Sequence, residues 1–279
     1  DLGWRSLQAA LSDLAASGAQ PVGFLVSLSA PPADFADPSW LDEVVAGLGE
    51  AAEMAACPVL GGDTTGSQAG LVLSLTVLGT AESPVTFTSS ERNPTVGQWG
   101  GIKIDGDNNT ANASFQHATI EYSGYGIRSY SLGSGDSLTV TNSTVRNNGS
   151  GIQSDDGNSG GTVSVTNSLI ADNLGYGIGG TSNWTRDHWT ITGNTITGNS
   201  KRAIYLEGTY SATVSDNVIA DNGGHGVHFN YLYYDFVFSG NTVSNNAGAG
   251  LMYQNGYNSN SSWATDNITV TDNTIIGNS

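Results

Sequence analysis

A short apolar phrase recurs through the last two thirds of this 279-residue chain at intervals of about 25 residues. The phrases begin at residues 115, 140, 165, 191, 214, 238 and 270: FQHATI, VTNSTV, VTNSLI, ITGNTI, VSDNVI, FSGNTV and VTDNTI. A repeat of this length is typical of solenoids, in which each unit stacks on its neighbours. The spacing therefore predicts an elongated array of about seven coils.

Two further columns appear when the units are aligned. An apolar column is formed by Ile127, Ile152, Ile178, Ile204, Val227 and Leu251, and a polar column by Ser123, Asn148, Asn173, Asn199, Asn222, Asn246 and Asn278. Stacked identical Asn side chains can hydrogen-bond along the axis of such an array. β-Branched residues suit strands, and Gly suits the turns between them. The units lack a Leu framework and helical periodicity, so the prediction is an all-β solenoid.

This repeat resembles the right-handed parallel β-helix superfamily, which includes pectate lyases and many surface proteins. SPVTFTSS followed by GQWGGIKI, residues 83–90 and 97–104, resembles the first coil of such proteins. The resemblance implies a carbohydrate-associated or surface-exposed protein, with a polysaccharide as a possible partner. It does not specify an activity, because function depends on sites added to a fold.

Alternation along the strand after each recurring Gly-Ile position predicts which side chains face outward. Two carboxylates in this outward set, Asp155 and Glu207, lie two coils apart, which corresponds to roughly 10 Å. That distance is near the upper limit for the acid and base of an inverting glycosidase, so a polysaccharide lyase or hydrolase is one hypothesis. The alternative is an ordinary solvated face. The candidate carbohydrate-binding residues are Tyr205, His228, Trp184, Trp189 and Tyr233.

Two weaker motifs lie in the same region. DGDNNTAN places Asp105, Asp107 and Asn109 at an alternate spacing that suits Ca²⁺, without the downstream Glu of a full calcium loop. A simple polar turn is the favoured explanation, with a Ca²⁺ site as the alternative. GGHGVHF contains His225, which occupies a column of turn residues.

The first eighty residues follow a different pattern, in the order helix, strand, helix, loop, strand. LGWRSLQAALSDLAASG predicts a helix and VGFLVSLSA a buried strand. ADPSWLDEVVAGLGEAAEMAAC predicts a second helix, which Asp37 caps and in which Pro38 takes the first position. GGDTTGS reads as a turn-rich loop before the strand LVLSLTVLG. This order predicts a mixed α/β unit.

The phrases ALSDLAASG, WLDEVVAGLGEAAE and LGGDTTGS, in that order, resemble thiamine-monophosphate kinase over about residues 2–79. The resemblance implies Mg²⁺ ligands at Asp13 and Asp63, a phosphate loop at Gly61, Gly62 and Thr64, and ATP as the nucleotide. The upstream Gly-Asp-Asp-Ala segment and the second domain of that family have no counterpart in the sequence, and phosphoryl transfer depends on complete positioning. We therefore expect an incomplete and inactive segment, with retained ATP-dependent kinase activity as an alternative.

The net charge of the chain limits the kinds of molecule that it can bind. The chain has 8 Lys and Arg against 25 Asp and Glu, for a net charge of −17, which argues against nucleic-acid binding. No apolar run reaches the length of a membrane span. We expect a hybrid chain with domains at 1–79 and 80–279. The β-helix part suggests secretion or the cell surface, whereas the kinase part suggests the cytoplasm, so the sequence leaves the location open.

Overall fold

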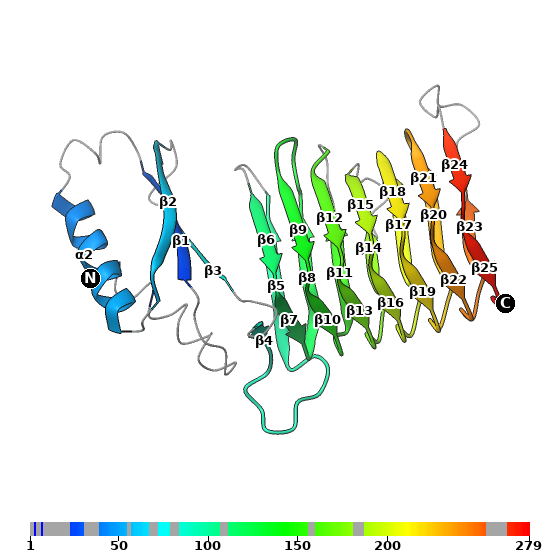
Figure 1. The fold of residues 1–279 in the computed structure, drawn as a ribbon, viewed down its shortest axis with the longest axis horizontal. Coiled ribbons are helices and arrows are strands. Elements are labelled where there is room, and N and C mark those ends of the chain that lie inside the picture. Colours follow the sequence, from blue (N-terminus) through cyan, green and yellow to red (C-terminus); the bar gives the residue numbers. More distant parts are fainter. Residues whose placement is uncertain are drawn as a thin grey trace. The chain divides into compact units, whose positions relative to one another are not determined.

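The computed structural model describes residues 3, 7, 23–30, 39–54, 57–66, 72–78, 84–106, 111–155, 160–180, 187–254 and 267–279. The chain forms two compact units, residues 1–87 and 88–279. Figure 1 shows a helix and a small sheet in the first unit and stacked strands in the second. No helix in the described ranges is both long and apolar enough to cross a bilayer.

The first unit is built on a three-stranded sheet in the order β2-β1-β3. Its strands are β1 (Gly23–Ala30), β2 (Val59–Gly66) and β3 (Val72–Leu78), and β1 pairs parallel with β2 and antiparallel with β3. Helix α2 (Ser39–Met54) buries Val44, Leu48 and Ala51 in a cluster with Phe24 of β1. These residues follow the helical spacing of one face. The predicted mixed α/β unit is confirmed.

Residues 61–64 differ from the sequence-based expectation of a loop. They lie within β2, where Gly61, Gly62, Asp63 and Thr64 pair with residues 25–28 of β1. Gly-Gly-Asp favours a turn locally, but pairing with the neighbouring strand β1 outweighs this preference. Asp13, Asp37 and the Asp63 side chain lie outside the described residues.

Residues 85–279 form a parallel β-solenoid with three sheets that run along its length. Sheet I contains β4 (Val85–Phe87), β7 (Ala118–Glu121), β10 (Thr144–Arg146), β13 (Leu169–Ala171), β16 (Thr195–Thr197), β19 (Val218–Ala220), β22 (Thr242–Ser244) and β25 (Thr274–Ile276). Sheet II contains β5 (Trp99–Asp105), β8 (Ser123–Tyr130), β11 (Ser150–Asp155), β14 (Ile178–Gly180), β17 (Ile204–Thr209), β20 (Val227–Leu232) and β23 (Leu251–Gln254). Sheet III contains β6 (Asn112–Gln116), β9 (Ser137–Thr141), β12 (Thr162–Thr166), β15 (His188–Thr192), β18 (Ser211–Ser215), β21 (Phe236–Ser239) and β24 (Ile268–Thr271). The predicted solenoid of about seven coils is confirmed.

The predicted apolar columns stack inside this solenoid. In sheet I, Val145 pairs with Ile170, Ile170 with Ile196, and Ile196 with Ile219. All four side chains are fully buried. In sheet II, Ile127, Ile152, Ile178, Ile204, Val227 and Leu251 form one register. Inward and outward side chains alternate along each strand. Each column of the interior therefore receives one side chain from every coil.

The predicted Asn column forms a continuous ladder at the turn between sheets I and II. The side-chain Oδ1 of each Asn accepts a hydrogen bond from the backbone N–H one coil earlier, from Asn148 to Asn278. Each Nδ2 also donates to a carbonyl of the preceding coil. Buried polar groups in these turns are thereby paired.

A second ladder, which the sequence analysis did not identify, occupies the turn between sheets III and I. It contains Ser143, Ser168, Asn194, Asn217, Asn241 and Asn273, and each accepts from a backbone N–H one coil earlier. The residue immediately before each member is Asn, Asp or Gly with positive φ, for example Asn142 at 49° and Asp216 at 57°. Asn, Asp and Gly tolerate this left-handed conformation best, which explains the recurring Asn-Ser, Gly-Asn and Asp-Asn pairs.

The coils differ in length mainly at the third corner, between sheets II and III. A single residue, Tyr210, connects β17 to β18 at this corner. The connection from β23 to β24 is longer and comprises residues 255–267. Equivalent ladder residues are accordingly 23 residues apart at Asn199 and Asn222, and 32 apart at Asn246 and Asn278. The turn between sheets I and II is also longer in the first coil, where residues 88–98 connect β4 to β5, whereas residues 147–149 connect β10 to β11.

Candidate functional site

A series of aromatic rings crosses the outer face of sheet II. Tyr176, which precedes β14, stacks on Tyr205 of β17 with 5.4 Å between ring centroids and 29° between planes. Tyr205 in turn lies 5.1 Å from the ring of His228 on β20. Gly179 pairs with Tyr205 and has no side chain, and a Cβ there would lie 3.6 Å from Cβ of Tyr176. The series thus extends over three coils.

Arg202 lies beside the tyrosines of this series. Its guanidinium is 4.6 Å from the ring centroid of Tyr205 and 5.8 Å from that of Tyr176. One of its nitrogens, Nη1, also donates to the Tyr176 hydroxyl at 3.2 Å. Lys201 places its ammonium 5.3 Å from the Tyr176 ring. These cation–π contacts hold two cations at the edge of the aromatic series.

Glu207 lies on the other side of Tyr205. Its carboxylate accepts from the Tyr205 hydroxyl at 2.8 Å and from Asn230 Nδ2 at 3.2 Å. Burial, followed by the hydrogen bond with Glu207, raises the pKa of Tyr205 to about 12. The Tyr205 hydroxyl is therefore a donor at neutral pH, and it fixes the position of the carboxylate.

His228 is buried, with 4% of its surface exposed. Burial lowers its pKa to about 4, with further lowering by Arg202 and His225, so its ring is neutral at pH 7. The nearby Gln254 side chain opposes this shift, although neither ring nitrogen reaches a hydrogen-bond partner among the described residues. Asn230 Oδ1 is also unpaired there. These atoms are buried, so they are unpaired polar groups of the packed face and are not exposed donors or acceptors.

Asp155 and Glu207, the predicted catalytic pair, both lie on sheet II, in β11 and β17 with β14 between them. They have different partners. Asp155 is 6% exposed, and its carboxylate receives Arg128 Nε at 2.6 Å and Gln153 Nε2 at 2.8 Å. The charge of Asp155 is thus balanced by Arg128, and a role of the two carboxylates in catalysis stays a prediction.

The remaining predicted carbohydrate-binding residues lie elsewhere. Trp189 is buried in the solenoid interior at 2% exposure, so it is a core residue and cannot form part of an exposed platform. Tyr233 follows β20 and contacts Tyr210 edge-on at 5.6 Å, at the third corner. Trp184 lies outside the described residues.

The predicted metal sites receive little support from the described residues. No group of three His, Cys, Asp or Glu there could hold a metal ion. Asp105 pairs with Lys103 at 2.9 Å, whereas Asp107 and Asn109 lie outside the described ranges. Gly61, Gly62 and Thr64 form part of an extended strand instead of a phosphate loop. A calcium site at Asp105 and a magnesium site at Asp13 and Asp63 therefore stay predictions.

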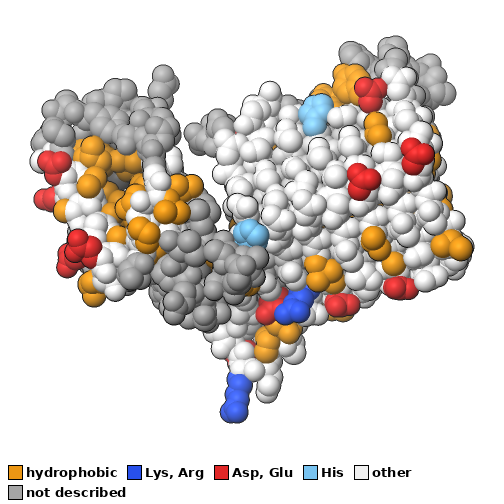
Figure 2. Space-filling model, viewed as in Figure 1, with side chains coloured by type: hydrophobic (Ala, Val, Ile, Leu, Met, Phe, Trp, Pro, Cys, Tyr) orange, Lys and Arg blue, Asp and Glu red, His pale blue; other side chains and the backbone are white. Residues whose placement is uncertain are grey.

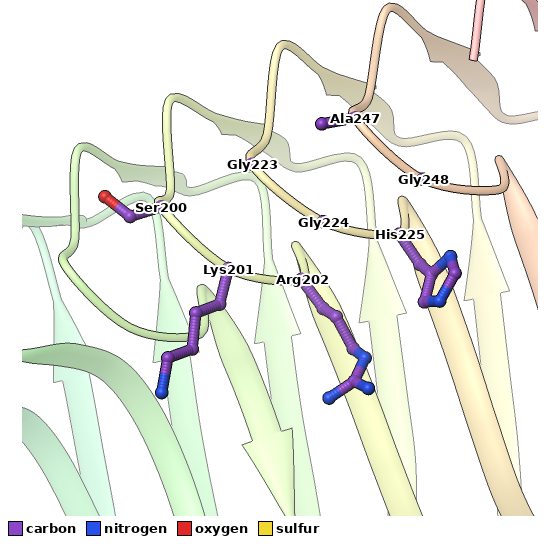
Figure 3. Close-up of a pocket in the computed structure, with 8 residues that line it drawn as sticks. All are labelled: Ser200, Lys201, Arg202, Gly223, Gly224, His225, Ala247 and Gly248. Carbon is purple, nitrogen blue, oxygen red and sulfur yellow. The ribbon is translucent and has the colours of Figure 1, made fainter. Parts of the chain in front are cut away.

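A groove of about 290 Å³ opens at the turns that lead into β17 and β20. Lys201, Arg202 and His225 line it, and Figure 3 shows their side chains projecting from the same side of the turns. Arg202 shares the column of turn residues to which the sequence assigns His225. The adjacent column contains Gly175, Gly224 and Gly248, with Lys201 in place of Gly in one coil, and that substitution was the available signal.

Comparison with known families separates the two units. Residues 130–279 match the family described as right handed beta helix region, and residues 73–136 match the pectate-lyase like beta helix domain. Residues 1–81 match the N-terminal domain of AIR synthase related proteins. Both resemblances predicted from the sequence are thereby confirmed. No solved structure matches the chain significantly.

The matching curated relatives are thiamine-monophosphate kinases. That of Methanocaldococcus jannaschii is 38% identical over 85 residues, covering 30% of this chain and 26% of the relative. The Synechococcus elongatus protein is 40% identical over 78 residues, or 28% of this chain and 23% of the relative. That of Rhodopirellula baltica is 35% identical over 91 residues, or 33% and 28%. The chain spans about a quarter of the length of these relatives.

Proposed function

Because this chain belongs to the right-handed β-helix family, we propose that its solenoid binds carbohydrate on the outer face of sheet II. The observation that carries the proposal is the series Tyr176, Tyr205 and His228, in which Tyr176 stacks on Tyr205 and Tyr205 contacts the tilted ring of His228, over three coils. Aromatic rings offer flat apolar surface with a polar edge. Such rings suit the apolar faces of sugar rings, and neighbouring polar groups suit their hydroxyls.

The polar groups beside the rings supply the second requirement. Glu207 provides carboxylate oxygens beside Tyr205, where the Tyr205 hydroxyl and Asn230 Nδ2 hold them in position. Coils repeat about every 4.8 Å, so a glycan lying along the solenoid would meet equivalent positions in successive coils. A binding site of a few directed polar groups among aromatic side chains is the usual composition of ligand sites.

Binding to a panel of neutral oligosaccharides, measured by isothermal titration calorimetry, tests the proposal. Tyr205→Ala should weaken binding at least tenfold, because it removes the central ring. Tyr234→Ala is the matched control, since Tyr234 is 48% exposed and lies at the third corner. Loss of binding in the control variant, with none in Tyr205→Ala, would place any sugar site on the corner and end this proposal.

A polysaccharide lyase or hydrolase is the alternative for the same face. Glu207 is held by Tyr205 and Asn230, as a positioned catalytic carboxylate would be. The pairing of Asp155 with Arg128 makes this proposal the weaker one, because it occupies the second carboxylate. Reducing-sugar release should be compared with that of Glu207→Gln. Equal rates would remove Glu207 from any mechanism.

For the first unit we propose an incomplete thiamine-monophosphate kinase segment without catalysis of its own. Supporting this, residues 61–64 pair with β1 in an extended conformation. Phosphoryl transfer needs nucleotide, metal and acceptor held together. Titration with Mg²⁺ and a non-hydrolysable ATP analogue should show no saturable binding. Saturable binding that disappears in Asp63→Asn would instead support a retained ATP site.

We propose further that the solenoid acts at the cell surface or outside the cell, where polysaccharides are accessible. Its family match, which covers residues 130–279, supports a repeat protein of this kind. Protease treatment of intact cells provides the test. Cleavage of the solenoid in intact cells is the expected result, and protection until lysis would contradict the proposal.

A further inference from the structure

Lys201 and Arg202 concentrate positive charge on an acidic protein. The chain has only 8 Lys and Arg against 25 Asp and Glu, yet these two are consecutive. Figure 2 shows a face of the solenoid on which charged side chains are few and scattered. Lys103, Arg128 and Arg146 each pair with a carboxylate. Lys201 and Arg202 form no such pair within the described residues, so two like charges adjoin without a counterion.

Arg202 is already held in place. Its contacts with Tyr176 and Tyr205, and the hydrogen bond from Nη1 to the Tyr176 hydroxyl, restrict the guanidinium. A guanidinium has five N–H donors, and Tyr176 takes one of them. A group that is ordered before binding loses less conformational entropy when a ligand arrives. Arg202 therefore presents positioned donors at the groove.

His225 adds a neutral donor beside these cations. Its Nδ1 accepts the backbone N–H of Ala249 at 2.8 Å. The remaining proton of the neutral ring consequently lies on Nε2. Burial, with the charge of Arg202, lowers the pKa of His225 and keeps the ring in this form at pH 7. Figure 3 shows the His225 ring in line with Lys201 and Arg202.

Glycines keep the groove open between these side chains. A Cβ on Gly224 would lie 2.9 Å from the Arg202 backbone nitrogen, and one on Gly248 would lie 2.6 Å from His225 Nδ1. Both distances are too short for a side chain, so larger residues would displace the walls. The result is a space of about 290 Å³ with two cations and one N–H donor on its walls.

From these observations we infer that the groove lined by Lys201, Arg202 and His225 binds a tetrahedral oxyanion, a sulfate or phosphate group. Such a group has several oxygens and can accept from donors on more than one side. Charge-assisted hydrogen bonds to Arg and Lys are the strong class of these interactions. The group can be a free ion or an ester on a larger ligand. Binding of the free ion does not depend on the proposed recognition of neutral sugars.

Calorimetric titration with inorganic sulfate and inorganic phosphate, at constant ionic strength with chloride as reference, tests the inference. Arg202→Gln keeps the length of the side chain and removes its charge, and we expect binding at least tenfold weaker. Arg146→Gln is the matched control, because Arg146 is an ion-paired cation on sheet I. Far-UV circular dichroism establishes that both variants are folded.

Titration with a sulfated oligosaccharide and with its desulfated counterpart shows whether the bound group is a free ion or an ester on a larger ligand. Tighter binding of the sulfated form that is lost in Arg202→Gln assigns the site to an ester, whereas equal affinity for the free ion and the ester assigns it to the ion itself. Binding of the free inorganic ions, which carry no sugar, distinguishes this site from the aromatic series. The inference is overturned when sulfate, phosphate and the sulfated oligosaccharide all fail to bind, or when Arg146→Gln weakens binding as much as Arg202→Gln.

Discussion

Removing one member of the Asn ladder should destabilise the solenoid strongly. Asn222 is 2% exposed. Its Nδ2 donates to Ile196 O at 3.0 Å, Ala220 O at 2.9 Å and Asn246 Oδ1 at 2.9 Å. Its Oδ1 accepts from the backbone N–H and from Nδ2 of Asn199, at 3.1 and 2.9 Å. Asn222→Ala removes all of these bonds at once.

The size of the effect follows from the groups left behind. The backbone N–H of Asn199 and the carbonyl of Ile196 lose their ladder partner in the variant. A buried polar group without a partner costs roughly 1–3 kcal/mol, so two of them cost about 2–6 kcal/mol. This is a large fraction of the roughly 5–15 kcal/mol that stabilises a typical domain.

Urea denaturation followed by far-UV circular dichroism measures the change. The matched control is Asn278→Ala in the last described coil, where the same side chain is partly exposed and water can replace its bonds. We expect the control to lose clearly less than Asn222→Ala. A loss below about 1 kcal/mol for Asn222→Ala, or equal losses in both variants, would refute the view that the ladder stabilises the stack through buried hydrogen bonds.

Three further outcomes follow from single buried groups. Burial raises the pKa of Asp187 to about 7, so between about pH 4 and 7 the folded state keeps a proton that the unfolded state releases. The free energy of unfolding should therefore fall by roughly 4 kcal/mol as pH rises through that window, and Asp187→Asn should flatten the fall in urea titrations at pH 5 and 8. Trp189→Ala should cost about 3–5 kcal/mol in the same assay, and Trp189→Phe less, because its indole N–H has no partner among the described residues. Asp155→Asn should lower the free energy of unfolding by about 1–3 kcal/mol, because it leaves the half-buried Arg128 unpaired. The loss should be smaller in an Arg128→Gln background, and equal losses in both backgrounds would contradict the pairing.

The repeat was predictable because the interior of a solenoid places the same requirement on every coil. Val145, Ile170 and Ile196 recur at the coil spacing since each must fill the same position in sheet I. The Asn column was predictable for the same reason. The second ladder was missed because Ser143 and Ser168 perform, in two coils, the role that Asn performs in the others. Different side chains that make the same hydrogen bond do not form a visible column.

The site was harder to predict because it depends on which way single side chains point. Alternation correctly placed Tyr205 and His228 on one face. Trp189 was taken for a surface residue because the register of β15 was not worked out, and pairing with Val163 and Ala212 puts it inside. Lys201 and Arg202 belong to a turn, where no periodicity indicates direction. Residues 61–64 became a strand because β1 offers pairing that local composition does not reveal.

The variable corner between sheets II and III makes the solenoid tolerant of inserted sequence. A connection of one residue at Tyr210 and another of residues 255–267 leave the two ladders in register on either side. Foreign peptides inserted at that corner would project from the solenoid at positions separated by whole coils. The spacing between two grafted epitopes could therefore be chosen in steps of one coil.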